Sequence, residues 1–309
     1  MTYYVLVLVI FLPSISDYYG IHLMIITFLF GMSGYSLIQT FMCSPGKVTT
    51  DLIEQIKLNL KVDMPHNNDE SIDLDATGDD STRESKQKLV LCNELNRLLL
   101  KYHSSPSRIK DFENTLTHGE NNSITEGSNA DNQLPVICQF KICDKCDQLQ
   151  PPRCYHCEVC NCCVLRMDHH CFWMGNCIGL YNFKSFTLYL FYMMNVTGYI
   201  SLMMTNVFTI DAIELIELMF YSLNLTAVTF LSFGLYFCML ILFLINIKLI
   251  WANQTSYEMQ LEFYKKPYKM EKFQSNLKEM FGFEYLWEIF VPTKPQTREY
   301  SEIIIPRNL

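Results

Sequence analysis

Cysteine and histidine are concentrated in one short stretch, which limits what this chain can fold into. Ten of the 13 cysteines lie within residues 138–177, together with three of the seven histidines. Two Cys-x-x-Cys pairs, Cys143/Cys146 and Cys157/Cys160, have the turn spacing with which two thiolates bind one Zn²⁺ ion. Each tetrahedral site needs two further ligands. The downstream candidates are His156, Cys163, His170 and Cys177, with Cys138, Cys154 and Cys162 as rivals.

The mixture of cysteine with histidine favours metal ligation in a reducing compartment over a disulfide framework. Sites filled by four protein ligands leave no open position for a reactive water, so the expected zinc ions are structural. This argues against a zinc hydrolase. It also predicts that the metals hold a segment with little apolar core of its own.

Apolar residues are segregated into four stretches that are nearly free of charge, which indicates a multi-pass membrane protein. The first is shorter than the roughly 20 residues that cross a bilayer, so a short span, a signal peptide and a truncated start are competing interpretations. A short span is favoured, because no Lys or Arg precedes Lys47. The stretches are Thr2–Ile15, Ile21–Met42, Phe186–Phe208 and Thr226–Ile250.

Loop charges predict the orientation of these spans. Neither Ser14–Gly20 nor Thr209–Leu225 contains a Lys or Arg. The positive-inside rule therefore places both termini and the Cys-rich segment in the cytosol, which agrees with four spans and not with three.

Residues 43–137 form a polar cytosolic loop that we expect to be largely disordered. Leu89–Tyr102 has helical apolar spacing and predicts one surface helix. The formal net charge of −8 gives no electrostatic case for nucleic-acid binding.

The run Asp168-His169-His170-Cys171 needs a separate explanation. If His170 binds zinc, His169 could activate Cys171 as a nucleophile, and Asp168 could orient His169. Adjacent residues rarely form such a set in a regular strand, so we expect an irregular loop held by metal. The competing interpretation is that Cys171 is a spare structural cysteine.

The run from Cys143 to Phe186 resembles the Cys-rich domain of the DHHC protein S-acyltransferases, or palmitoyltransferases. It contains the tetrad Asp168–Cys171, and further residues at the family spacing lie on both sides of it. Thr255-Ser256-Tyr257-Glu258 resembles the family's Thr-Thr-x-Glu motif, and Asn276 with Phe281-Gly282 resembles its C-terminal motif. The sequence departs from the family at Phe172, where Pro is usual, at Ser256, and at Gln150, where many members have Lys.

The resemblance implies two interleaved zinc sites, with Cys171 left free as a nucleophile. His169 would be the general base and then the acid, and Asp168 would orient it. Thr255, Glu258 and Asn276 would support the tetrad. Arg153 is the leading candidate for an acyl-CoA phosphate contact, with Arg166 and Lys184 behind it. The implied ligand sets are Cys143, Cys146, His156 and Cys163 for one site, and Cys157, Cys160, His170 and Cys177 for the other.

The expected fold is therefore an all-α polytopic membrane protein with four transmembrane helices and a zinc-bound Cys-rich domain between the second and third. The expected division is 1–42 (helices 1 and 2), 43–137 (loop), 138–185 (Cys-rich domain), 186–250 (helices 3 and 4) and 251–309 (cytosolic tail).

By resemblance, the function is S-palmitoylation of cytosolic cysteines on membrane-associated proteins, with palmitoyl-CoA as co-substrate and an acyl-Cys171 intermediate. Span lengths favour the Golgi or endoplasmic reticulum over the plasma membrane. The alternatives are a catalytically inactive zinc-binding membrane adaptor and a zinc-finger scaffold of the ubiquitin-ligase type.

Overall fold

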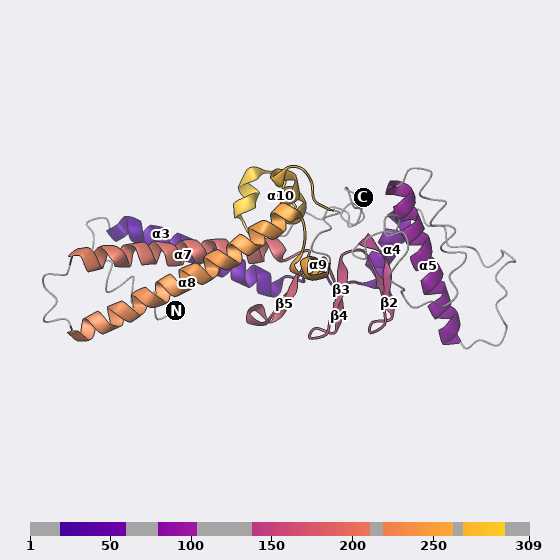
Figure 1. Cartoon of the computed structure of the whole chain (residues 1–309), viewed down its shortest axis with the longest axis horizontal. Helices are drawn as coiled ribbons and strands as arrows, with labels where there is room; N and C mark the ends of the chain where they lie inside the picture. Colours follow the sequence, from indigo (N-terminus) through magenta and orange to yellow (C-terminus); the bar gives the residue numbers. More distant parts are fainter. Residues whose placement is uncertain (1–18, 60–79, 104–137, 211–218, 262–267, 294–309) are drawn as a thin grey trace. The chain divides into compact units, whose positions relative to one another are not determined.

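The computed structural model describes residues 19–59, 80–103, 138–210, 219–261 and 268–293 (Figure 1). These residues fall into two compact units, a helical unit and a Cys-rich unit. Among the described residues, the helical unit contains 19–43, 182–210, 219–250 and 283–293, and the Cys-rich unit contains the others.

The helical unit is built from three long helices, α3 (Tyr19–Met42), α7 (Phe183–Ile210) and α8 (Met219–Ala252). Helices α3 and α7 pack along each other in antiparallel directions. His22 Nδ1 lies 2.7 Å from the Tyr199 hydroxyl oxygen at one end of the pair, and Asn182 donates to the Thr40 carbonyl oxygen at the other. The 3-10 helix η6 (Leu286–Phe290) joins this unit through the Tyr192 hydroxyl, which donates to the Phe290 carbonyl oxygen at 2.6 Å.

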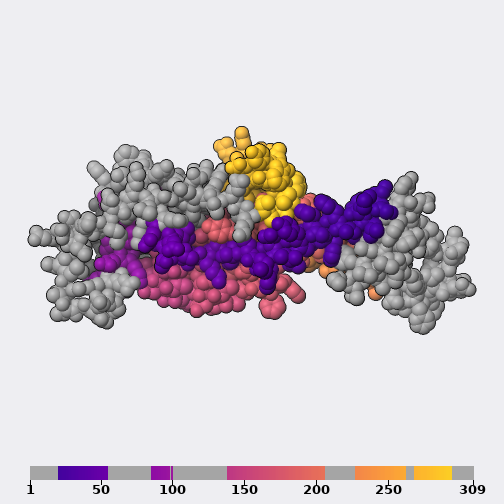
Figure 2. All heavy atoms as spheres, turned by 180° about the vertical axis from the view of Figure 1, so that it is seen from behind, coloured from indigo at the N-terminus to yellow at the C-terminus, as the bar shows by residue number. Residues whose placement is uncertain are grey.

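Helix α8 approaches α7 closely at a single glycine. A Cβ atom added to Gly198 would lie 2.8 Å from the Tyr236 ring, so any larger residue would push the two helices apart. Many large apolar side chains on α3 and α8 are nevertheless exposed, including Phe28 and Phe230. Figure 2 shows α3, in indigo, lying on the surface of the molecule.

Two of these helices are long and apolar enough to cross a membrane by length and composition, Gly20–Met42 and Ala227–Ala252. They coincide with the second and fourth predicted spans. The third predicted span lies within the continuous helix α7. The first, Thr2–Ile15, lies outside the described residues, so the four-span arrangement stays a prediction.

The expectation of an all-α protein is wrong in the Cys-rich unit, where three short antiparallel hairpins follow one another. Each first strand has three or four residues and is followed by a tight turn that reverses the chain. The segment therefore forms paired strands and not a helix. The strands are β1 (Lys141–Cys143) with β2 (Gln148–Gln150), β3 (Cys154–Cys157) with β4 (Cys162–Leu165), and β5 (His169–Cys171) with β6 (Asn176–Ile178).

The turns of the first two hairpins share one backbone feature. The residue after each Cys-x-x-Cys pair, Asp147 in one and Asn161 in the other, has a left-handed φ of 47°. Asp and Asn tolerate this conformation better than most residues do. Gly179 is required for a different reason, because a Cβ there would lie 2.5 Å from the Pro45 carbonyl oxygen.

The polar loop contributes two helices, α4 (Thr50–Asn59) and α5 (Asp80–His103), while residues 60–79 and 104–137 lie outside the described ranges. The predicted helix over Leu89–Tyr102 is confirmed by α5, but this helix also builds the core. Its Leu91, Cys92, Leu95 and Leu99 are buried in one cluster with Cys143 and Cys163.

Asn96 fixes the position of α5. Its amide donates to the Phe140 carbonyl oxygen at 3.0 Å, and its side-chain oxygen accepts from the Phe140 backbone N–H at 2.7 Å. The Asn96 side chain thereby makes the two backbone hydrogen bonds to Phe140 that a neighbouring strand would otherwise make. The tail contributes α9 (Ser256–Leu261) and α10 (Phe273–Phe281) to the same unit.

We predict that Leu95→Ala destabilises the Cys-rich unit by about 2–5 kcal/mol, because it leaves a cavity in a packed core. Leu95 is 0% exposed. Leu89 is 53% exposed on the same helix, so Leu89→Ala is the matched control and should change stability by less than about 0.5 kcal/mol. Chemical denaturation of the detergent-solubilised protein measures both. Equal effects would show that α5 is not part of the core.

Candidate functional site

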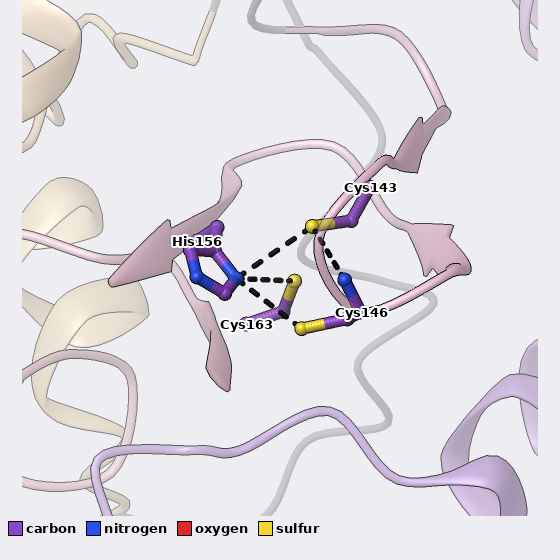
Figure 3. Close-up of side chains that lie close together, drawn as sticks. All are labelled: Cys143, Cys146, His156 and Cys163. Atoms are coloured by element: carbon purple, nitrogen blue, oxygen red, sulfur yellow. Dashed lines mark hydrogen bonds between the residues drawn. The ribbon is translucent and has the colours of Figure 1, made fainter. Parts of the chain in front are cut away.

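The first metal-binding group joins the first two hairpins (Figure 3). Cys143 and Cys146 come from the β1–β2 turn, and His156 and Cys163 come from β3 and β4. The three sulfur atoms lie 3.6, 3.2 and 4.0 Å from His156 Nδ1, in the order Cys143, Cys146 and Cys163. All four ligand atoms lie within 4.8 Å of one another and point toward one centre.

The second group repeats this arrangement one hairpin further along the chain. Cys157 and Cys160 come from the β3–β4 hairpin, and His170 and Cys177 come from β5 and β6. Their sulfur atoms lie 3.6, 3.4 and 3.5 Å from His170 Nδ1. Each of the two Cys-x-x-Cys pairs therefore belongs to its own metal-binding group.

Strand alternation explains why the two groups interleave. Successive side chains of a strand point to opposite faces, so the neighbours His156 and Cys157 on β3 belong to different groups. His156 lies opposite Cys163 in the ladder, and His170 lies opposite Cys177. Each cross-strand pair therefore brings two ligands of one group together.

The donor sets fit zinc. Three thiols and one imidazole form the Cys₃His set of structural zinc sites. Both groups match the sets implied by the family resemblance. The rivals Cys138, Cys154 and Cys162 lie outside both groups.

Three of the four tetrad residues form a short strand, so the expected irregular loop is wrong for His169–Cys171, while Asp168 directly precedes the strand. β5 contains His169, His170 and Cys171. Alternation directs His170 toward the second metal group and places His169 and Cys171 on the opposite face of the strand. A strand can thus separate metal binding from chemistry among adjacent residues. Its partner β6 lies across a turn that includes the exposed Phe172.

Asp168 and His169 form a close pair. His169 Nδ1 lies 2.7 Å from Asp168 Oδ2, and since a carboxylate only accepts, the nitrogen is the donor. The side chain of His169 is 36% exposed, whereas that of Asp168 is 2% exposed.

Ser256 completes the environment of Asp168. Its backbone N–H donates to Asp168 Oδ1 at 2.6 Å, and its hydroxyl donates to Oδ2 at 3.1 Å. Ser256 replaces the second Thr of the Thr-Thr-x-Glu motif but retains its hydroxyl, and this hydroxyl binds Asp168. With His169, the carboxylate of Asp168 accepts three hydrogen bonds, which stabilise its charged form.

Glu258 meets Arg153, 105 residues earlier in the chain, in a buried two-bond ion pair. Nε and Nη2 of Arg153 donate to the Glu258 carboxylate at 2.6 and 2.9 Å. The guanidinium also lies 4.2 Å from the centre of the Tyr268 ring. Burial lowers the pKa of Arg153, but the Glu258 charge outweighs this effect, and the net pKa lies above the ordinary value.

The structure thus supplies a protein partner for the charge of Arg153, and the contact with an acyl-CoA phosphate stays a prediction. The two weaker candidates are buried as well. Arg166 donates to Asn253 Oδ1 at 2.8 Å, and burial together with the Arg153 charge lowers its pKa to about 10. Lys184, in the helical unit, donates to the Thr293 hydroxyl at 2.9 Å.

Asn253 is a functional residue that the sequence analysis missed. Its side-chain oxygen accepts from Arg153 and Arg166, and its amide donates to Glu279 Oε1 at 3.0 Å. It lies outside the recognised motifs, and its left-handed φ of 48° at the end of a helix could not be read from residue spacing.

The supporting residues named from the sequence bind backbone groups. Thr255 caps the start of α9 by accepting from the Glu258 backbone N–H at 3.2 Å. The Asn276 oxygen accepts from the Met270 backbone N–H at 2.8 Å, and its amide donates to the Trp251 carbonyl oxygen at 3.0 Å. These hydrogen bonds connect segments of the C-terminal tail with one another.

Residues 137–262 match the family model described as DHHC palmitoyltransferase. This match confirms the resemblance over that part of the chain. The chain is 35% identical over 161 residues to "Probable protein S-acyltransferase 13" from Arabidopsis thaliana, covering 49% of this chain and 51% of that protein. It is 57% identical over 54 residues to "Probable protein S-acyltransferase 14" from the same plant, covering 18% of each chain.

A third relative comes from an animal. The chain is 49% identical over 67 residues to "Palmitoyltransferase ZDHHC15" from Xenopus laevis, covering 20% of each protein. The matches thus span about half or less of these curated relatives. The family and the two apolar helices together indicate a membrane protein.

We predict that Glu258→Ala lowers the free energy of unfolding by about 3–5 kcal/mol, because it leaves the Arg153 charge buried without its carboxylate partner. The exposed pair between Lys145 and Glu158 offers a control. Glu158→Ala should leave the denaturation midpoint close to that of the wild type, because water screens that pair. Denaturation midpoints measure both. A Glu258 variant as stable as the control would contradict a structural role for the buried pair.

Proposed function

We propose that this protein is a protein-cysteine S-acyltransferase that moves a long-chain acyl group from acyl-CoA to cysteine thiols of other proteins. The observation that carries the proposal is the Asp168–His169 pair on the strand of Cys171, with both residues outside the two metal groups. Structural zinc alone explains neither the pair nor the cysteine. The palmitoyltransferase names of its relatives support a palmitoyl chain.

In the first step, His169 Nε2 takes the proton of the Cys171 thiol, and the sulfur attacks the thioester carbonyl carbon of acyl-CoA. The carbon–sulfur bond to CoA breaks, and the CoA thiolate takes the proton from His169. Asp168 holds the ring through Nδ1 and stabilises the imidazolium that forms between the two transfers.

In the second step, a substrate cysteine gives its proton to His169 and attacks acyl-Cys171. The acyl group moves to the substrate, and the Cys171 thiol is restored. Each step exchanges one thioester for another, so no nucleotide is required. Two zinc ions, each held by one Cys₃His group, would keep β5 and its neighbours folded when bound.

The acceptors that suit this reaction are membrane-associated proteins with cytosolic cysteines, because a sixteen-carbon acyl chain gains roughly 0.8 kcal/mol per methylene removed from water. We place the acyl chain among four membrane spans and both termini in the cytosol. We place the protein in the Golgi or endoplasmic reticulum. The exposed apolar faces of α3 and α8 support a lipid environment.

Accessibility of short tags tests the proposed orientation. Tags at Asn67 and Leu309 should both be reachable from the cytosol in selectively permeabilised cells, and a tag inside 14–20 should be protected. Opposite sides for the Asn67 and Leu309 tags would contradict the four-span orientation.

A catalytically inactive zinc-binding adaptor is the competing function. The close Asp168–His169 contact favours the enzyme, because a scaffold has no use for an imidazole oriented by a buried carboxylate. Incubation of the purified protein with a clickable acyl-CoA separates the two. An adduct that hydroxylamine removes supports the enzyme, and no adduct supports the adaptor.

We predict that cysteine variants divide by role. Cys171→Ser should abolish the labile adduct while two zinc ions per chain remain, because a serine hydroxyl is nearly isosteric but a poor nucleophile. His169→Ala should also keep zinc and lose most of the rate, by roughly 10²–10⁴-fold for a general base. Zinc per protein and hydroxylamine-labile label are measured together.

The matched comparisons remove metal ligands. Cys146→Ala, Cys160→Ala and His170→Ala should lose zinc and expression together, and acylation with them. His169 and His170 are adjacent, so their opposite outcomes test strand alternation directly. Metal loss in Cys171→Ser, or metal retention in His170→Ala, would overturn the division into ligands and catalysts.

A further inference from the structure

The sulfur atom of Cys163 has a hydrogen-bond partner beyond its metal group. Cys163 is completely buried in β4. The side-chain amide of Gln150 donates to its Sγ at 3.2 Å. Gln150 belongs to neither metal group.

The fold holds Gln150 in place. It is the last residue of β2, where it pairs with Lys141 of β1, and Pro151 and Pro152 restrict the chain directly after it. Leu149 points to the other face of the strand and is buried in the core with Cys163. The amide therefore has a defined position over the first metal group.

A zinc ion with three thiolates and one neutral imidazole carries a net charge of −1. Placing that charge in a protein interior is costly unless hydrogen-bond donors disperse it. The Cys-x-x-Cys turns supply one donor each. The backbone N–H of Cys146 donates to Cys143 Sγ, and that of Cys160 donates to Cys157 Sγ, both at 3.4 Å.

Cys163 comes from a strand and not from such a turn, so its donor comes from a side chain. We propose that Gln150 is a positioning residue of the first zinc site: its amide holds Cys163 as a metal-bound thiolate and slows the loss of the ion. This inference depends on zinc at that site and not on acyl transfer.

The choice of glutamine has a further consequence. Many members of the family have Lys at this position, whereas Gln150 donates a hydrogen bond without adding a positive charge. The first site of this chain therefore keeps its negative charge and relies on the geometry of neutral donors.

Zinc release to an excess of a colorimetric chelator tests the proposal on the full-length protein in detergent. We expect Gln150→Leu to release one of its two zinc ions about tenfold faster than the wild type, in the range that outer-shell changes produce, and the other at the wild-type rate. Gln150→Glu, which matches the shape but replaces the donor with a negative charge, should be at least as fast. Gln150→Lys keeps a donor and should release zinc as slowly as the wild type.

Gln148 provides the matched control, because it lies two residues earlier on the same strand and is half-buried like Gln150. Gln148→Leu should release both ions at wild-type rates. Alkylation by iodoacetamide during release, mapped by mass spectrometry, identifies the site: Cys143, Cys146 and Cys163 should be labelled before Cys157 and Cys160 in the Gln150→Leu protein.

Wild-type release from both Gln150→Leu and Gln150→Glu would overturn the proposal. Equal acceleration of both ions, or the same acceleration in Gln148→Leu, would also overturn it, since either result indicates general destabilisation. If Gln150→Leu does not fold, the comparison between Gln150→Glu and Gln150→Lys decides. Formation of the labile adduct on Cys171, measured in parallel, reports separately on the proposed acyltransferase activity.

Discussion

Convergence of three sulfurs and one imidazole on each of two centres is the constraint on which the Cys-rich unit depends. The three hairpins have strands of three or four residues, too short to be stable in isolation. Each ligand group ties neighbouring hairpins together, and β3 contributes to both groups. Metal binding therefore supplies the long-range contacts that such short strands cannot.

The same geometry prepares the tetrad for chemistry. Because adjacent residues of a strand point to opposite faces, His170 can serve the metal group while His169 and Cys171 face away from it. Asp168 orients the imidazole and is itself held by Ser256 from the tail. A structural site and a reactive site thus share one three-residue strand without competing for ligands.

Buried charge joins the tail to the hairpins. Arg153 and Glu258 neutralise each other, and Asn253 bridges Arg153 to Arg166. Such a pair contributes little net stability compared with apolar packing, but breaking one side is expensive. We therefore interpret the Glu258–Arg153 ion pair as an anchor that holds the neighbouring Ser256 in contact with Asp168.

The sequence by itself determined the two zinc ligand sets, the separate tetrad and the helix over Leu89–Tyr102, because local spacing and family motifs carry that information. Only the tertiary structure decided that His169–Cys171 form a strand, that α5 belongs to the core, and that Asn253 and Gln150 contact the buried residues Arg166 and Cys163. Those outcomes depend on strand pairing and burial between distant residues. Spacing along the chain does not encode which side chain will be opposite which, so the buried partner of Arg153 could be found only in the folded protein.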